Sequence, residues 1–343
     1  MNAGSFLNTV TTRAYSLPLV ILYVTEGCNM QCLMCSYRTP RPTELTLQQI
    51  ESLAAKLAGF GLRHIVYSGG EPLMRRDFPE ICQLFKRYNV NQSLLTNGLL
   101  LGKRKEELHH VLSEIIISLD GPTAEVHNGI RGIDAFNRII EGVRSAIAVR
   151  MAGQVSIRCV VQKRNFRHMG AMVDLAESLG VTRISFLAAD VLSGAFGRNS
   201  LDEVEKNREI ILSKEEIAEF RESLEELVRT HRRAFERRFV SESPHKLFHL
   251  ADYYEALHGK TSFPRNVCNA PMVSSVITST GDLQPCFFLP AFGSVHDGTI
   301  AQTLNSPSIR STRSRVKEYS MDRCQTCVCT LKVSPFTALL DQF

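Results

Sequence analysis

Three closely spaced cysteines, Cys28, Cys32 and Cys35, lie in the run CNMQCLMC. This CxxxCxxC spacing lets three thiolates surround one iron–sulfur cluster. Small core residues or a zinc knuckle are the alternative interpretations of such a run. Because a four-iron cluster takes four ligands, three cysteines leave one iron able to bind a group that the protein does not supply. Chemistry is expected at that open iron.

A second cysteine group lies near the C-terminus and comprises Cys268, Cys286, Cys324, Cys327 and Cys329. Segments 274–278 and 283–288 predict a β-hairpin around a Gly-Asp turn, which puts Cys286 on the second strand and brings it toward Cys268. The CxxC pair at 324 and 327 can complete a set of four ligands. Spacing alone does not distinguish a Cys₄ zinc site from an iron–sulfur cluster.

The composition is that of an ordinary soluble protein: 343 residues, 44% apolar, 22% charged and a net charge of +5. The basic residues are spread along the chain, so no nucleic-acid partner is expected. No apolar stretch is long enough for a membrane span, and no signal peptide is recognisable. We therefore expect a cytoplasmic protein with no membrane partner, whose ten cysteines serve metal binding rather than disulfides. Cys82 and Cys159 are interpreted as packing residues.

Strand-like and helix-like segments alternate through the first half of the chain, which indicates an α/β fold with a parallel sheet. The pattern predicts a helix from Thr46, with Leu47, Ile50, Leu53 and Leu57 on its buried face. Strands are predicted at 17–25, 65–68, 93–96, 115–119, 155–161 and 184–187. Charged helices follow, so we divide the chain into a barrel at 1–198, a helical bridge at 199–265 and a small hairpin-and-helix domain at 266–343.

Short polar motifs follow the second, third and fourth predicted strands: GGEP at 69–72, TNG at 96–98 and SLDG at 118–121. Glycines at a strand end let the backbone approach a ligand closely. Carboxylate and open carbonyl groups can accept hydrogen bonds from an ammonium group, and a hydroxyl beside a carboxylate can hold a ribose. Each motif alone is most simply turn chemistry.

The ordered set of CxxxCxxC, GGEP, TNG and SLDG resembles the radical S-adenosylmethionine (SAM) superfamily, and the resemblance covers Leu17 to about Ala189. It implies a partial (β/α)6 TIM-like barrel. It also implies a SAM-binding 4Fe-4S cluster, whose open iron chelates the amino and carboxylate groups of S-adenosyl-L-methionine. One electron from the cluster then cleaves SAM to methionine and a 5′-deoxyadenosyl radical, which abstracts a hydrogen from the substrate.

The resemblance assigns Cys28, Cys32 and Cys35 as cluster ligands, and it places Gly69, Gly70 and Glu71 at the methionine amino end of SAM.

Five further SAM contacts follow from the resemblance. Ser118 and Asp120 are expected near the ribose and the carboxylate, and Leu187 is expected to contact adenine through its backbone. Arg131 matches a family arginine that reaches the methionine carboxylate. Met34 stands where the family usually has an aromatic residue beside adenine, and a methionine can fill that space flexibly.

The C-terminal segment resembles the family's SPASM and twitch auxiliary-cluster domains, and GDLQPC matches their GxxxxC element. The full SPASM pattern needs about seven cysteines, and five are present. The shorter twitch form is therefore favoured, with a second, auxiliary 4Fe-4S cluster held by Cys268, Cys286, Cys324 and Cys327, and Cys329 is an alternative to Cys327.

With all four irons ligated, such a cluster favours an oxidative reaction. The leading hypothesis is dehydrogenation of a small molecule by an enzyme of the oxidoreductase class, with flavodoxin or ferredoxin as electron donor. A peptide maturase is the alternative, and because only 27 residues precede Cys28, such an enzyme is expected to need a separate recognition protein. A synthase of the molybdenum-cofactor type is disfavoured because the glycine-rich tail is missing. The non-enzyme alternative is an iron–sulfur or zinc scaffold protein, which would not need the ordered GGEP, TNG and SLDG motifs.

No side chain identifies the substrate or the catalytic base. Tyr67, His127, Arg158 and Asp190 lie at predicted strand ends or in loops, where polar residues are generic candidates for substrate contact.

Overall fold

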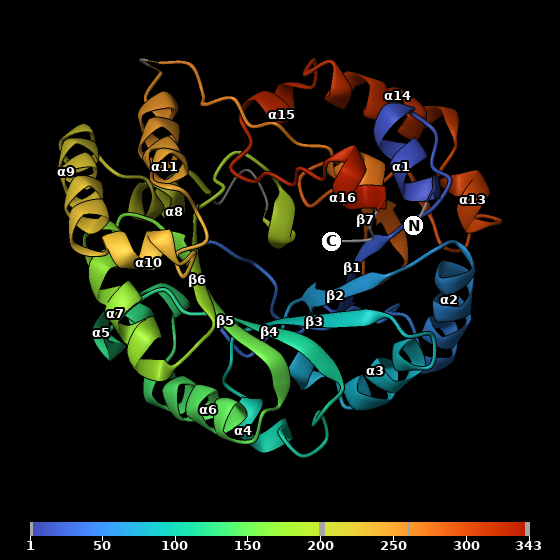
Figure 1. Cartoon of the computed structure of the whole chain (residues 1–343), viewed down its shortest axis with the longest axis horizontal. Coiled ribbons are helices and arrows are strands. Elements are labelled where there is room, and N and C mark those ends of the chain that lie inside the picture. Colours follow the sequence, from blue (N-terminus) through green and yellow to red (C-terminus); the bar gives the residue numbers. More distant parts are fainter. Residues whose placement is uncertain (1–2, 199–202, 260, 340–343) are drawn as a thin grey trace.

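A nine-stranded sheet organises the computed structural model, which describes residues 3–198, 203–259 and 261–339. The strand order is β6-β5-β4-β3-β2-β1-β7-β8-β9, and helices cover the outside of the curved sheet (Figure 1). The α/β partial barrel expected from the sequence is therefore confirmed. The first predicted domain boundary, between 198 and 199, falls at the edge of the described residues.

The first six strands are parallel and follow one another in chain order: β1 Leu19–Thr25, β2 His64–Gly69, β3 Asn91–Thr96, β4 Leu112–Ser118, β5 Ala152–Val161 and β6 Arg183–Ala188. All six overlap the predicted segments. The connections carry α2 Leu47–Gly59, α3 Phe78–Lys86, α4 Leu101–Arg104, α5 Ala124–Arg131, α6 Phe136–Ala148 and α7 Met169–Leu179, with 3₁₀ turns at Pro72–Met74 and Phe166–His168. Parallel order places all six carboxyl ends at one rim, where such folds build their sites.

The two faces of each strand differ, as a half-open barrel requires. Ile115, Ile117 and Ile157 are fully buried and point outward to the helices. Their neighbours Ile116 and Arg158 are only half-buried and face the inside of the barrel. Alternate burial of side chains along each strand thus leaves a polar, accessible inner face.

Helix α2 begins after Thr46, whose side chain forms a capping box with Gln49, as the predicted helix start requires.

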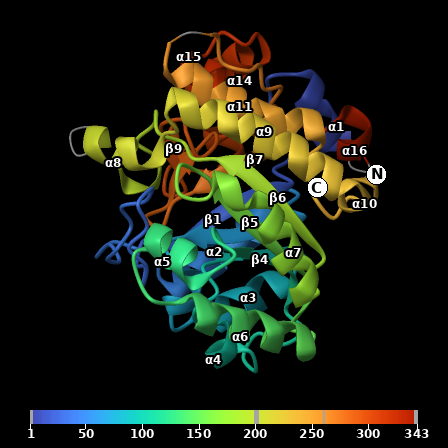
Figure 2. The ribbon, with the colours of Figure 1, turned by 90° about the vertical axis from the view of Figure 1, so that its left-hand side faces the viewer.

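The helical bridge comprises α8 Glu203–Ile210, α9 Lys214–Thr230, α10 Arg232–Glu236 and α11 Pro244–Leu257. Charged helices were expected in this segment, and four are described. Helices α9 and α11 lie side by side, and α11 contacts β6 (Figure 2). The Tyr254 hydroxyl donates to the carbonyl of Val161 at 2.6 Å, which ties the bridge to the end of β5.

The C-terminal segment contains α12 Ala270–Val273, β7 Ser274–Ile277, β8 Asp282–Gln284, β9 Gly293–Ser294, α13 Ile300–Thr303, α14 Pro307–Lys317, α15 Asp322–Gln325 and α16 Pro335–Leu339. β7 and β8 form the predicted hairpin. β7 also pairs in parallel with β1, from Leu19–Ser274 to Leu22–Ile277, which the sequence did not indicate. The N-terminal helix α1 Ala3–Val10 contacts α12 and α16 (Figure 1).

The prediction that Cys286 lies on the second hairpin strand is wrong. β8 ends at Gln284, because Pro285 has no N–H to continue the ladder, and Cys286 follows in a bend. Cys82 in α3 and Cys159 in β5 are buried in the core, as expected. Among the described helices, none is both long and apolar enough to cross a membrane.

Candidate iron–sulfur and SAM site

The first three cysteines lie in the loop that leaves β1. Cys32 is buried, and Cys28 and Cys35 are half-buried. The Cys28 N–H donates to the carbonyl of Arg38 at 3.0 Å and closes the loop. The N–H of Gln31 donates to the carbonyl of Arg131 at 2.9 Å, and that of Leu33 donates to Ile130 at 3.1 Å. These bonds dock the loop against the end of α5.

Two side-chain donors face the sulfur atoms of this loop. Arg131 Nη1 lies 3.7 Å from Cys32 Sγ, and Asn97 Nδ2 lies 4.0 Å from Cys28 Sγ. Burial raises the pKa of Cys28 to about 11 and also raises the pKa of Cys35. Without metal these two thiols hold their protons, so cluster binding releases protons. Three thiols with cationic and amide donors nearby fit a thiolate-bound cluster.

Arg131 is held in place by a buried carboxylate. Its Nη2 lies 2.7 Å from Asp120 Oδ2, and Asp120 is fully buried. Asp120 Oδ1 also accepts a hydrogen bond from the N–H of Val160 at 2.8 Å. Burial alone would lower the pKa of Arg131, but Asp120 and the Cys32 sulfur outweigh it and raise that pKa above its usual value. The guanidinium therefore bridges Asp120 and Cys32.

Glu71 joins the GGEP and TNG motifs. Its carboxylate accepts hydrogen bonds from Thr96 Oγ1 at 2.8 Å and from the N–H groups of Asn97 at 2.7 Å and Leu73 at 3.0 Å. Complete burial raises its pKa to about 7, although these hydrogen bonds work in the opposite direction. The side chain is thus engaged within the protein, and it fixes the ends of β2 and β3 relative to each other.

Gly69 and Gly70 pack directly against the chain leaving β1. Gly69 has φ +110°, and a Cβ atom there would lie 2.3 Å from the carbonyl oxygen of Thr25. A Cβ atom on Gly70 would lie 2.2 Å from the carbonyl oxygen of Gly27. Within the described part of the chain no donor reaches the Gly70 carbonyl oxygen. The motif therefore brings an open backbone acceptor up to the cysteine loop.

The remaining predicted SAM contacts lie around the same rim. Ser118 ends β4 and is half-buried. Leu187 on β6 is half-buried and pairs in register with Val160. Met34 packs against a small apolar cluster that includes Ala189 and Val191. The structure thus brings these three residues to the same end of the barrel as the cysteine loop.

The polar residues that were generic candidates for substrate contact lie in different environments. Tyr67 is fully buried and donates to Gln92 Oε1 at 2.7 Å, so it is a core residue. His127 is also buried, and its Nδ1 accepts from the N–H of Asp120 at 3.2 Å. Burial and the nearby Arg131 lower its pKa to about 3, so the ring is neutral. Asp190 forms ion pairs with Arg198 and with Arg323, which precedes Cys324.

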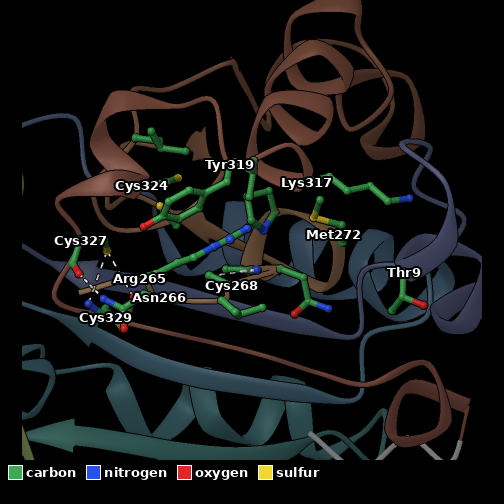
Figure 3. Close-up of a pocket in the computed structure, with 17 residues that line it drawn as sticks. Thr9, Arg265, Asn266, Cys268, Met272, Lys317, Tyr319, Cys324, Cys327 and Cys329 are labelled. Carbon is green, nitrogen blue, oxygen red and sulfur yellow. Dashed lines mark hydrogen bonds between the residues drawn. The ribbon is translucent and has the colours of Figure 1, made fainter. Parts of the chain in front are cut away.

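All five C-terminal cysteines line one pocket of about 220 Å³ (Figure 3). Burial raises the pKa of Cys286 to about 12 and raises those of Cys324, Cys327 and Cys329. Arg265 lies over the Tyr319 ring, 4.9 Å from its centroid, at the pocket's wall. A thiol-lined pocket of this size fits an iron–sulfur cluster held by four of the five cysteines.

Over the described ranges, no three His, Cys, Asp or Glu side chains converge closely enough to hold a single metal ion. A Cys₄ zinc site requires four sulfurs about 2.3 Å from one ion. The five cysteines line a pocket with room for more than one metal ion, which suits a multi-iron cluster.

An aromatic group that the sequence analysis missed lies between the two cysteine sites. The Tyr23 ring on β1 lies 6.2 Å from Tyr37 and 6.3 Å from Phe287, which follows Cys286. Burial, Tyr37 and the thiols of Cys35 and Cys286 raise the pKa of Tyr23 well above its usual range. Tyr23 is therefore close to a ligand candidate of each site. Only its apolar position on β1 was visible in the sequence.

The loop after β6 also reaches both sites. It contains a 3₁₀ turn, Ala195–Gly197, in which Phe196 has φ 62°. The Phe196 carbonyl accepts from the N–H of Ser36 at 3.0 Å, and it lies 3.7 Å from Cys35 Sγ. The Phe196 ring lies 6.1 Å from that of Phe287. One loop thus contacts the first cysteine motif and the segment beside the second.

A half-barrel with an open three-cysteine motif at its rim and a second thiol pocket defines an iron–sulfur enzyme that uses SAM. Family models agree: residues 22–176 match the Radical SAM superfamily, and residues 268–328 match SPASM, an iron-sulfur cluster-binding domain. Residues 22–176 thus form a radical SAM domain, and residues 268–328 form a C-terminal SPASM-type domain. The cofactors of the chain are accordingly a 4Fe-4S cluster with SAM and auxiliary iron–sulfur chemistry in the second domain.

Curated relatives match the barrel. A probable GTP 3′,8-cyclase of Saccharolobus solfataricus is 34% identical over 168 residues, which is 48% of this chain and 54% of that protein. The Fe-coproporphyrin III synthase of Methanosarcina barkeri is 31% identical over 176 residues, 49% of this chain and 43% of that protein. The chain thus spans about half the length of the curated relatives it matches.

Solved structures match nearly the whole fold. SuiB of Streptococcus suis bound to S-adenosylmethionine superposes with a TM-score of 0.67 at 16% identity, covering 95% of this chain and 77% of that one. The structure of anSMEcpe with AdoMet and the Cp18Cys peptide gives 0.62 at 18% identity, covering 96% of both chains. At these identities the likeness concerns the fold.

Proposed function

We propose that the protein is an oxidising radical SAM enzyme. With both clusters and SAM bound, the cofactors supply an electron that splits SAM, a deoxyadenosyl radical that takes a substrate hydrogen atom, and an acceptor for the electron left behind. The substrate would lose one hydrogen atom to the deoxyadenosyl radical, which becomes deoxyadenosine, and then one proton to solvent and one electron to the second cluster, so the product would be oxidised by two electrons. We favour a small-molecule substrate, a flavodoxin or ferredoxin as donor, and the cytoplasm as compartment.

The chain's own residues bind and orient the reactants. In this proposal Cys28, Cys32 and Cys35 hold the first cluster, while Arg131, fixed by Asp120, balances the charge of Cys32. The open Gly70 carbonyl and its neighbours in GGEP accept the SAM ammonium group. Ser118, Leu187 and Met34 surround the nucleoside part.

The contact between the rings of Tyr23 and Phe287, 6.3 Å apart, carries the oxidative part of the proposal, because it joins the strand that leads into the first cysteine loop to the residue after Cys286. A second cluster ligated by Cys268, Cys286, Cys324 and either Cys327 or Cys329 would lie near the barrel rim. Because every iron would then be bound by cysteine, it would serve as an electron acceptor rather than a substrate ligand.

A peptide substrate is the second candidate. Two structures that share this fold were solved with peptides: SuiB with its precursor peptide SuiA, and anSMEcpe with the Cp18Cys peptide. The small-molecule and peptide alternatives use the same two clusters, so they differ in substrate and not in the first step.

Deuterium transfer distinguishes the two substrates. Reduced holoenzyme with SAM is incubated with the low-mass fraction or the peptide fraction of a fully deuterated cell extract, and deoxyadenosine is analysed by mass spectrometry. Deuterated deoxyadenosine from the low-mass fraction supports the proposal, and deuterium only from the peptide fraction supports the alternative. Failure of the reduced protein to form deoxyadenosine at all would refute the proposed function.

A further inference from the structure

The inner face of the barrel carries a polar row directly below the rim. Ser118 on β4 pairs in register with Arg158 on β5, which pairs with Ser185 on β6. Because side chains alternate along a strand, these residues share one face. Arg158 and Ser185 line a cavity of about 250 Å³ inside the barrel, together with Glu114, Ser156, Arg183 and Glu242. The row therefore borders an accessible space.

Arg158 differs from the other arginines near this space because it lacks an acidic partner. Arg183 pairs with Glu114 at 2.5 Å, and Arg131 pairs with Asp120 at 2.7 Å. Arg158 donates only from Nε, to Ser185 Oγ at 3.3 Å, and in the described ranges no carboxylate oxygen lies within 4 Å of its guanidinium. The outer nitrogens are left for a ligand.

Glu242, the other acid that lines this cavity besides Glu114, is already engaged. Its Oε2 accepts from the N–H of Phe186 at 2.8 Å. Burial raises the pKa of Glu242, and the charges of Lys246 and Arg158 only partly offset that rise. Glu242 lines the same cavity without forming an ion pair with Arg158.

Arg158 lies on the inner face of the barrel at the level of Ser118, where β4 ends. It is two residues before Val160, which pairs with Leu187, so it lies about 7 Å below Leu187 along the strands. In the proposed function, a substrate beside the nucleoside would lie in this space.

We propose that Arg158 binds an oxyanion of the substrate, either a carboxylate or a phosphate. This inference rests on the proposed function, because it assumes that the barrel interior holds the substrate. A guanidinium presents a planar fork that matches both oxyanions, and Ser185 fixes its orientation through Nε. The ion pairs of Arg183 and Arg131 occupy those guanidinium groups, which leaves Arg158 as the arginine of this cavity with free donors.

Anaerobic titration calorimetry of the SAM-loaded holoenzyme tests this assignment with inorganic phosphate and, separately, with acetate. We expect saturable binding of at least one anion, weakened about tenfold or more in Arg158→Gln. Arg158→Lys keeps the charge without the fork and should bind with intermediate strength. Arg232→Gln removes an exposed arginine on α10 and should bind like the wild type. Stronger binding of phosphate or of acetate indicates which oxyanion the substrate carries.

Unchanged anion binding in Arg158→Gln, or no saturable binding of either anion to the wild type, would overturn the inference. If Arg158→Gln does not fold by circular dichroism, the comparison of Arg158→Lys with the wild type decides, and equal affinities contradict the role of the fork. Deoxyadenosine formation by the wild type is measured in the same preparations. Its absence contradicts the proposed function, whereas its presence without anion binding contradicts only the inference about Arg158.

Discussion

The two cysteine sites are built differently. Around the first, side-chain donors from distant elements join the local N–H groups: Arg131 on α5 faces Cys32, and Asn97 after β3 faces Cys28. In the second pocket, the N–H donors to sulfur come from within two residues, from Ala270 to Cys268 and from Cys329 to Cys327, both at 3.4 Å. The sheet therefore positions the first site independently of its cluster. The second site depends more on its bound cluster to hold the loops of the C-terminal domain together.

Replacing Cys32 with alanine should have the largest effect. Loss of one of three cluster ligands should reduce deoxyadenosine formation to the background without enzyme, while the C-terminal cluster remains. Anaerobic assays by chromatography, with iron analysis, check this. The matched control is Cys82→Ala, which removes a buried thiol outside both sites. Wild-type deoxyadenosine formation in Cys32→Ala would disprove the role of this motif.

Replacing Cys286 with alanine should separate the sites. We expect bound iron to fall from about eight to about four atoms per chain, with deoxyadenosine still formed and oxidised product lost. The second domain should also become less stable, because a cluster that staples loops contributes to folding. Iron analysis, product quantification and circular dichroism check this. A folded variant with wild-type product yield would contradict the electron-acceptor role.

Replacing Asp120 with asparagine should lower the free energy of unfolding of the protein, although it removes no cluster ligand. Arg131 would be left as a buried unpaired charge, which typically costs about 3–5 kcal/mol. Urea denaturation of the wild type and the variant measures the change. Glu226→Gln is the control, since it breaks an exposed ion pair with Arg229 and should cost no more than about 1 kcal/mol. Equal losses of unfolding free energy in Asp120→Asn and Glu226→Gln would show that burial does not strengthen the ion pair of Asp120 with Arg131.

Glu71 should produce a smaller, pH-dependent effect. Its pKa rises from 4.5 to about 7 on burial, so the folded chain binds more protons than the unfolded chain between these values. The contribution of Glu71 to the free energy of unfolding is therefore fully present below about pH 4.5 and is lost as the pH rises to 7. In urea denaturation at pH 5 to 8, the wild type should lose stability relative to Glu71→Gln as the pH rises. Parallel pH profiles would contradict the raised pKa.

The sequence was sufficient for the parts of the fold that depend on local patterns. Apolar runs placed the six strands, and the order of the motifs at their ends placed the cysteine loop, GGEP and TNG at one rim. The pairing of β7 with β1 was not predictable, because parallel pairing leaves no local signal across about 250 residues. The ion pair of Asp190 with Arg323 joins residues 133 positions apart and was missed for the same reason. The prediction that Cys286 lies on the hairpin strand was wrong because Pro285 ends β8 at Gln284.

The pairing of β7 with β1 has a consequence for synthesis of the chain. β1 is made early, but one of its edges stays unpaired until residues 274–277 have been made. An apolar strand with an open edge is a template for aggregation. A chain truncated before residue 274 is therefore expected to lose solubility as well as its second thiol pocket. A segment synthesised about 250 residues later protects the first strand, so co-translational chaperones have a defined interval in which this edge needs cover.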